Sequence, residues 1–182
     1  MNDFLVLAPT HEEFLLMSKV LPSKCKLVEI GVGKAAAAAS TALETQVPYK
    51  QVFLIGFCGS PYLPLGTISI PSQTFYHDSY VPVELQTELT QKYDLPGSDG
   101  PILTADSFVT PELCSRLVSA YSKDIFYDME AAAVAQICAW TNSPLSVIKM
   151  VSDNPSTNYI DFVSTNPSFS PFSAFIESYR EA

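Results

Sequence analysis

Three acidic residues follow apolar runs that have the length and composition of buried strands. The acids are Glu12, Glu130 and Asp153, and the runs that precede them are residues 4–8, 125–127 and 144–151. In a parallel sheet the carboxyl ends of the strands form the edge at which ligands bind. Three carboxylates that converge on this edge suggest acid–base chemistry on a sugar or a base.

Two of these acids also have a simpler structural explanation. Glu130 ends the sequence Asp-Met-Glu, where carboxylates at the start of a helix complement the helix dipole. Asp153 lies in a Ser-Asp-Asn-Pro sequence that is typical of a turn. Glu130 is followed by AAAVA, however, which has no bulk to cover it, so this carboxylate can face a crevice and bind vicinal ribose hydroxyls. The common position of all three acids favours a functional site.

Two further polar residues interrupt apolar segments. Lys149 lies inside VIKMV, and because a lysine in such a strand is seldom buried without a partner, we expect it to pair with one of the carboxylates. His77 precedes Asp78, but adjacent residues of a strand face opposite sides, so this pair does not predict a catalytic relay.

The segment GVGKAA at residues 31–36 matches the G-x-G-x-x-A fingerprint of dinucleotide-binding proteins. That fingerprint also requires an acidic residue at the end of the next strand, and the next strand here, VFLIG, ends without one. The segment therefore predicts a tight glycine turn that lets a helix pack close to the sheet, and no cofactor is expected.

The elements that position these residues alternate along the chain. The expected strands are residues 4–8, 26–30, 51–56, 67–71, 102–105, 125–127 and 144–151. The expected helices begin at residue 11 and span 34–44, 84–92, 111–119, 129–140 and 171–179. This alternation predicts an α/β fold, a three-layer α/β/α domain with a central mixed, largely parallel sheet. No helix fits between 51–56 and 67–71, so we expect these two strands to pair directly.

Composition excludes several classes of function. The 182 residues are 47% hydrophobic, which is enough for one core, and we expect a single domain over 1–182. A net charge of -9 disfavours nucleic acid and anionic membrane surfaces as partners. The four cysteines are far apart, so neither a metal site nor a disulfide framework is expected, and a reducing cytoplasm fits best. We expect neither a signal peptide nor a membrane span.

In order along the chain, seven segments resemble the purine nucleoside phosphorylase superfamily, specifically its hydrolytic branch of methylthioadenosine/S-adenosylhomocysteine nucleosidases and futalosine nucleosidases. The segments are APTHEEF, GVGKAAAA, LIGFCGSPYLPLG, FYHD, ILTADSF, DMEAAAVAQIC and IKMVSD. The resemblance covers nearly the whole chain, and DMEAAAVA followed by a strand ending in V-S-D is its most specific part. It implies a nucleoside phosphorylase-like fold, a small purine nucleoside as substrate and a homodimer.

The resemblance also implies roles for individual residues. Glu12 would activate the attacking water, with Glu13 as an alternative one residue along, and Asp153 would be the acid that protonates the leaving purine. Glu130 would hold the ribose hydroxyls. The other residues expected to line the substrate site are Met129, packed against the sugar; Phe108, stacked on the base; Val109, bonding its edge through the backbone; and Gly59, Phe57 and Ser152.

Two departures from the family pattern concern the water site. Lys149 replaces the family's usual arginine, and we expect it to orient Glu12 and the water. Phe57 replaces a small polar residue. A catalytically impaired nucleoside-binding relative is therefore one alternative to an active nucleosidase.

Two further alternatives concern the nucleophile, which is water or phosphate, and the type of substrate. A phosphorolytic enzyme is disfavoured because phosphate needs cationic partners and the two arginines, Arg116 and Arg180, lie in predicted peripheral elements. The opening APTHEE and the short loops resemble futalosine-type members at least as much as methylthioadenosine-type members, which would connect the protein to menaquinone synthesis.

Overall fold

The computed structural model describes residues 3–78, 92–121, 124–155, 157 and 159–180. The strands are β1 Phe4–Ala8, β2 Cys25–Glu29, β3 Gln51–Gly59, β4 Ile68–Ser69, β5 Gln73–Tyr76, β6 Tyr93–Asp94, β7 Ile102–Thr104, β8 Phe126–Asp128 and β9 Leu145–Asp153. The helices are α1 His11–Ser18, α2 Lys34–Glu44, α4 Pro111–Ala120, α5 Ala131–Trp140, α6 Tyr159–Val163 and α7 Ser170–Ser178. The helix expected over 84–92 lies, apart from Lys92, outside the described residues.

Strand β3 joins the two halves of one curled sheet. Its residues 51–54 pair with β1 and its residues 52–59 pair with β9, both parallel to it, while β2 extends the sheet beyond β1. At its C-terminal end Gly59 pairs with Tyr127 of the antiparallel β8, which begins a second half in the order β8-β7-β5-β6. The expectation of a mixed, largely parallel sheet is confirmed.

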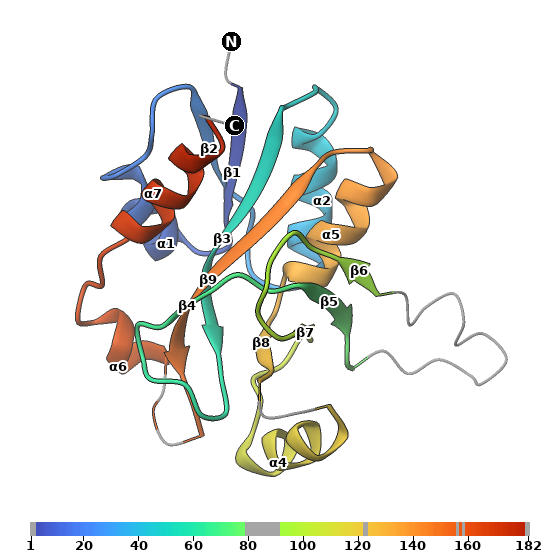
Figure 1. Ribbon diagram of the computed structural model, residues 1–182, viewed down its shortest axis with the longest axis vertical. Helices are drawn as coiled ribbons and strands as arrows, with labels where there is room; N and C mark the ends of the chain where they lie inside the picture. The colour runs from blue at the N-terminus through green and yellow to red at the C-terminus, as the bar shows by residue number, and fades with distance from the viewer. Residues whose placement is uncertain (1–2, 79–91, 122–123, 156, 158, 181–182) are drawn as a thin grey trace, which may run out of the picture.

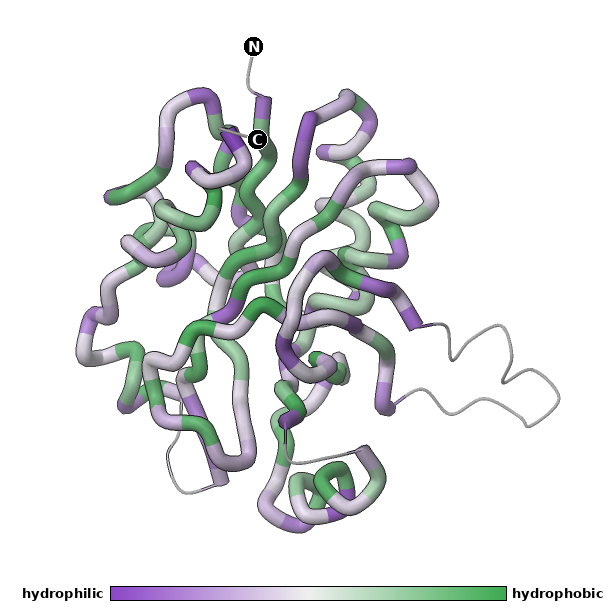
Figure 2. The backbone as a smooth tube through the Cα atoms, in the orientation of Figure 1, coloured by the Kyte–Doolittle hydropathy of each residue, from purple (hydrophilic) through white to green (hydrophobic). Residues whose placement is uncertain are grey.

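Helices cover both faces of this sheet (Figure 1). Helices α1 and α7 pack on one face, against residues such as Phe4 and Phe53, and α2 and α5 pack on the other, against residues such as Leu5 and Leu54. Neighbouring strand residues thus face different apolar layers, which explains why β1 and β3 are continuous apolar runs. The same strands form the hydrophobic centre of the tube in Figure 2. This arrangement confirms the expected three-layer fold.

The expected pairing of residues 51–56 with 67–71 is wrong. Strand β4 pairs with β9, because β9 occupies the flank of β3 with a parallel ladder that runs from Val52 to Gly59. That ladder also extends β9 to Asp153, so Ser152 and Asp153 end the strand and do not form a separate turn. Helix α5 begins at Ala131, two residues later than expected.

Three short elements were not expected from the sequence: β5, β6 and α6. Within the described part of the chain, no helix is both long and apolar enough to cross a membrane. Cys25, Cys58, Cys114 and Cys138 are free thiols.

Candidate active site

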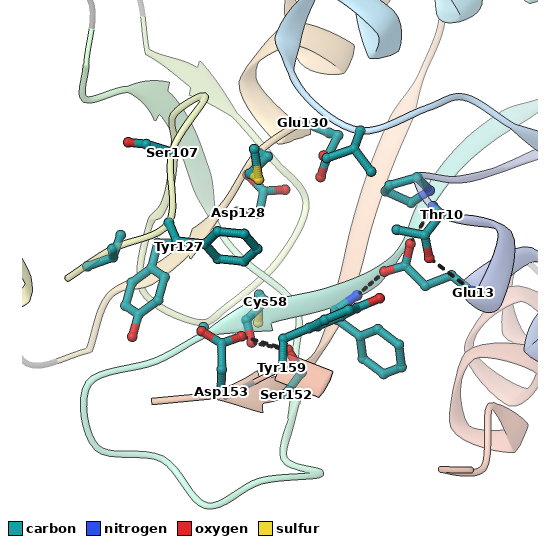
Figure 3. A pocket seen from close by; sticks show the side chains of 17 residues that line it. Thr10, Glu13, Cys58, Ser107, Tyr127, Asp128, Glu130, Ser152, Asp153 and Tyr159 are labelled. Atoms are coloured by element: carbon teal, nitrogen blue, oxygen red, sulfur yellow. Dashed lines mark hydrogen bonds between the residues drawn. The ribbon is translucent and has the colours of Figure 1, made fainter. Parts of the chain in front are cut away.

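A pocket opens where β1, β3, β8 and β9 end. It is lined by Pro9, Thr10, Glu13, Val32, Phe57, Cys58, Gly59, Ser107, Phe108, Val109, Tyr127, Asp128, Met129, Glu130, Ser152, Asp153 and Tyr159. In Figure 3, Glu13, Glu130 and Asp153 approach this pocket from three sides.

Most of the expected site residues line this pocket. These are Phe57, Gly59, Phe108, Val109, Met129, Glu130, Ser152 and Asp153. Glu12 does not: its side chain is exposed on the outer side of α1, and the structure places Glu13 in the pocket instead. Lys149 lies beneath the pocket wall and is fully buried. His77 is not among the lining residues.

Glu13 is held by the chemistry that starts helix α1. The Thr10 hydroxyl accepts a hydrogen bond from the Glu13 backbone N–H (3.2 Å), and Glu13 Oε2 accepts one from the Thr10 backbone N–H (2.7 Å). This reciprocal arrangement is a capping box. Glu13 is 2% exposed, and burial raises its pKa against the opposing effects of Lys149 and the N–H donors.

The other Glu13 oxygen is bound by strand β3. Phe57 N–H donates to Glu13 Oε1 over 2.6 Å, and a Cβ on Gly56, whose φ is +143°, would overlap this carboxylate. The Phe57 ring is buried in the core and meets Tyr159, Phe162 and Phe169 at centroid distances of 5.7, 5.9 and 5.3 Å. Phe57 therefore contributes its backbone to the acid site and its side chain to the core.

At the start of α5, two carboxylates have different partners. Asp128 accepts hydrogen bonds from Ala131 N–H (3.0 and 3.2 Å) and from the Thr104 hydroxyl (2.7 Å), so it caps the helix. Glu130 turns away from α5 and accepts a hydrogen bond from Gly33 N–H over 2.9 Å. The dipole-related explanation therefore applies to Asp128, whereas Glu130 faces the pocket.

Lys149 neutralises part of this acidic cluster. Its Nζ lies 2.9 Å from Asp128 Oδ2 and 4.0 Å from Glu130 Oε2. Burial would lower the pKa of Lys149, but the charges of Asp128, Glu130 and Glu13 outweigh burial and raise it, so the ammonium stays charged. Burial raises the pKa of Glu130 to about 7 against the opposing charge of Lys149. The expected pairing of Lys149 with a carboxylate is confirmed; its nearest partner is Asp128, not Glu12.

Asp153 ends β9 on the opposite side of the pocket. Its carboxylate accepts a hydrogen bond from the Ser152 hydroxyl over 2.8 Å, and burial raises its pKa despite that bond. Beside it, a Cβ on Gly59 would overlap the ring of Tyr127, so only glycine allows this close approach of β3 and β8. A partly buried acid whose pKa is raised by burial is better suited to donating a proton than an exposed one.

The glycine turn before α2 has the expected packing role and one more. Gly31 and Gly33 have φ of +82° and +88°, and a Cβ on Gly31 would lie 2.9 Å from that of Ala36. The turn also presents the Gly33 N–H to Glu130. Among the described residues, no group of three or more histidine, cysteine or acidic side chains is arranged to hold a metal ion.

Comparison with known proteins identifies the family. No protein-family model matches the chain. The 5'-methylthioadenosine/S-adenosylhomocysteine nucleosidase of Buchnera aphidicola subsp. Acyrthosiphon pisum (strain APS) is 32% identical over 172 residues. The match covers 76% of this chain and 74% of that protein. The chain belongs to the 5'-methylthioadenosine/S-adenosylhomocysteine nucleosidase family. Members of this family are N-glycosyl hydrolases acting on purine nucleosides.

Other relatives agree with this assignment. The nucleosidase of Buchnera aphidicola subsp. Baizongia pistaciae (strain Bp) is 32% identical over 162 residues, and the match covers 74% of this chain and 64% of that protein. The crystal structure of S-adenosylhomocysteine nucleosidase from Streptococcus pyogenes, in complex with 5-methylthiotubericidin, has a TM-score of 0.80 at 22% identity and covers 96% of each chain. The nucleosidase fold is thus preserved at low sequence identity.

Several pocket residues were not found from the sequence. They are Pro9, Thr10, Val32, Cys58, Ser107, Tyr127, Asp128 as a lining residue, and Tyr159. For the choice between Glu12 and Glu13 a signal was present: Thr10 and Glu13 have the T-x-x-E spacing of a capping box, which turns the fourth residue back toward the strand end.

Proposed function

We propose that this chain hydrolyses the N-ribosidic bond of 5'-methylthioadenosine and S-adenosylhomocysteine and releases adenine. The observation that carries the proposal is the arrangement of Glu13, Glu130 and Asp153 around one pocket in a chain of this family. Cleavage of such a bond requires a protonated leaving base, a carboxylate near the oxocarbenium-like charge and a positioned water. One carboxylate is available for each task.

Asp153 is the proposed general acid. Burial favours its protonated form, and the Ser152 hydroxyl fixes the orientation of the carboxyl group. On the same side, Phe108 would stack on the purine and the Val109 backbone would bind its edge. Gly59 and the adjacent Tyr127 also line the pocket.

Glu13 is the proposed water-activating residue and Glu130 the ribose-binding residue. Each Glu13 oxygen accepts one backbone N–H, and a carboxylate oxygen has a further lone pair for a water. Glu130 Oε1 is fixed by Gly33, which leaves Oε2 for ribose hydroxyls. Met129 would pack against the sugar. Lys149, paired with Asp128, is proposed to fix the position of Glu130 and to supply a positive charge near Glu13.

Hydrolysis is proposed over phosphorolysis because of the charges near the pocket. Among the described residues, no arginine or lysine lines the pocket. Arg116 lies exposed on α4, and the charge of Lys149 is directed to Asp128. A phosphate would therefore meet four acidic side chains with little cationic compensation.

Futalosine and aminodeoxyfutalosine form a second candidate substrate class. Tyr159, which lines the pocket and packs on Phe57, favours it, because a ring-bearing 5'-substituent would pack on the Tyr159 ring. Cleavage of such a substrate would connect the protein to menaquinone synthesis.

We also propose a homodimer in the cytoplasm. Val32 and Phe108 line the pocket yet are 52% and 72% exposed, and a second copy would cover apolar side chains at its mouth. Four free cysteines are consistent with a reducing compartment. Sedimentation analysis should give twice the chain mass, and a monomer at micromolar concentration would contradict the dimer.

The proposed activity is tested by chromatography after incubation with each of the four nucleosides, with and without phosphate. Phosphate-independent release of free base, with the 5'-substituted ribose as the other product, supports hydrolysis. The 5'-substituted ribose 1-phosphate would indicate phosphorolysis, and binding without any release would indicate an impaired relative. The Asp153→Asn variant should lose at least about a hundredfold in turnover while still binding nucleoside.

A further inference from the structure

Helix α2 begins with two consecutive backbone amides that donate to carboxylates from different parts of the chain. Gly33 N–H donates to Glu130 Oε1 over 2.9 Å, and Lys34 N–H donates to Asp106 Oδ1 over 2.8 Å. The N-cap residue Gly33 has no side chain to satisfy these amides itself. The start of α2 is therefore capped by one pocket carboxylate and by one carboxylate that follows β7.

The Lys34 side chain extends this connection to a third segment. Its Nζ lies 2.7 and 2.9 Å from the two oxygens of Asp78, after β5, and 3.3 Å from Asp106 Oδ2. Asp106 N–H in turn donates to Asp78 Oδ2 over 2.9 Å. We call Lys34, Asp78 and Asp106 the clasp, because every pair among them is joined by a hydrogen bond or an ion pair.

The clasp ends at the segment that lines one side of the pocket. Asp106 is followed directly by Ser107, Phe108 and Val109, all of which line the pocket. Val109 packs against the small core formed with α4, but Phe108 is 72% exposed and Ser107 is also exposed. Few apolar contacts hold the start of this segment, so its position depends on Asp106.

We propose that Lys34, Asp78 and Asp106 are positioning residues that hold segment 107–109 over the base-binding side of the pocket. The adjacent amides of Gly33 and Lys34 also fix this segment relative to Glu130, so the base site and the ribose site share one anchor. This inference rests on the proposed function, in which Phe108 and Val109 contact the purine. It assigns the clasp no contact with substrate.

Because the clasp is partly exposed, its loss should have different effects on global stability and on activity. The side chains of Lys34, Asp78 and Asp106 are 23%, 27% and 55% exposed, and ion pairs of this exposure contribute little to global stability. Orientation of reacting groups, in contrast, is sensitive to shifts of about 1 Å. Breaking the clasp should therefore lower kcat/KM much more than it lowers the free energy of unfolding.

The test compares Lys34→Met with Lys26→Met in the full chain. Lys26 pairs with Glu44 at the other end of α2, so it is a matched control for losing one ion pair of the same helix. For Lys34→Met we expect kcat/KM for adenine release to fall at least about tenfold, with a melting temperature within about 4 °C of the unmodified protein. Lys34→Arg should keep most of the kcat/KM of the unmodified protein, and Lys26→Met should leave kcat/KM unchanged.

A second readout needs no substrate. Hydrogen exchange of the amides in 106–109 should be faster in Lys34→Met than in the unmodified protein, since the Asp106 amide is bound to Asp78, and Lys26→Met should leave it unchanged. Asp106→Asn, measured in parallel, should behave as Lys34→Met does. Equal exchange rates in all variants would overturn the proposed positioning role of the clasp, even if adenine release confirms the nucleosidase activity. Faster exchange in a chain that releases no base would support the clasp and reject the proposed function.

Discussion

The β1–α1 and β8–α5 junctions both place acidic residues at the start of a helix, but they distribute two tasks differently. At β1–α1 one residue, Glu13, caps the helix through Thr10 and also lines the pocket. At β8–α5 the tasks are divided: Asp128 caps the helix and binds Lys149, while Glu130 is directed to the pocket by Gly33. A substitution that removes the acid at the first junction should therefore change both stability and activity. At the second junction, one substitution should change mainly stability and another mainly activity.

The two junctions also differ in how their charge is balanced. Glu13 is surrounded by backbone N–H donors, whereas Asp128 and Glu130 share one buried ammonium. Neutral donors fix a carboxylate without a counterion, but a buried ion pair becomes a large penalty when one partner is removed. The second junction should therefore be the more sensitive to a single charge change.

The largest effect is expected for Lys149→Met. The lysine is fully buried and the side chain of its partner Asp128 is 1% exposed, so the substitution leaves a buried carboxylate unpaired. We expect the free energy of unfolding to fall by about 3 to 5 kcal/mol, measured by urea denaturation. Lys149→Arg keeps the charge and should be far less destabilising, although the guanidinium is larger.

A double variant distinguishes charge from packing. Lys149→Met combined with Asp128→Asn should recover part of the lost stability, because neither partner is then charged. An unchanged unfolding free energy in Lys149→Met alone would contradict the assigned pairing.

The next effect concerns the first junction. Glu13→Gln replaces one acceptor oxygen by an amide donor that would face a backbone N–H of Thr10 or Phe57, and it removes the proposed water-activating charge. We expect turnover to fall at least about a hundredfold, together with lower stability. Glu12→Gln, one residue away and exposed, is the matched control and should leave both unchanged. Similar losses in both variants would restore Glu12 as a candidate.

Glu130→Gln should affect binding more selectively. We expect the affinity for nucleosides to fall by about tenfold with little change in the affinity for free adenine, because only the ribose contacts Glu130 in the proposed complex. Isothermal calorimetry with both ligands measures this difference. An equal loss for nucleoside and adenine would place Glu130 elsewhere in the site.

The same variant should change how stability depends on pH. The pKa of Glu130 is about 7 in the folded chain and 4.5 without the fold, so between these values the folded state holds a proton that the unfolded state has lost. This carboxyl therefore lowers stability progressively as pH rises from 4.5 to 7. Glu130→Gln should make unfolding free energies flatter over that range, and Glu13, whose pKa is raised by burial in the same direction, should retain part of the slope.

The fold was predictable where burial is continuous. Apolar runs such as 4–8 and 51–56 match strands that are buried on both faces, and the alanine-rich run at 34–44 matches α2. The placement of Glu130 and Asp153 in the pocket followed from the rule that strand ends meet at one edge. These features depend on local pattern and on general topology.

Other features depend on contacts between distant segments. The two residues of β4 carry no pattern that selects β9 over β3, and only the ladder between β3 and β9 decides the matter. The pairing of Lys149 with Asp128 likewise follows from which strands meet. Tyr159 reaches the pocket from a five-residue helix in a region rich in serine, asparagine and proline, where neither periodicity nor composition indicates a helix.

The smallest effect tests whether capping and chemistry are joined at the first junction. Thr10 and Thr110 cap α1 and α4 through equivalent bonds, from Glu13 N–H over 3.2 Å and from Leu113 N–H over 3.3 Å. Each alanine substitution should lower the unfolding free energy by about 1 kcal/mol.

Only Thr10→Ala should also reduce turnover, since the lost hydroxyl accepts from the Glu13 backbone N–H and completes the capping box in which the Thr10 N–H holds the Glu13 carboxylate. Thr10→Ser preserves the hydroxyl and should restore both stability and turnover. Thr110→Ala should lower stability alone, because α4 contributes no capping residue to the pocket. If the two alanine variants reduce turnover equally, the effect on activity comes from general destabilisation, and the dual role of the β1–α1 junction would be wrong.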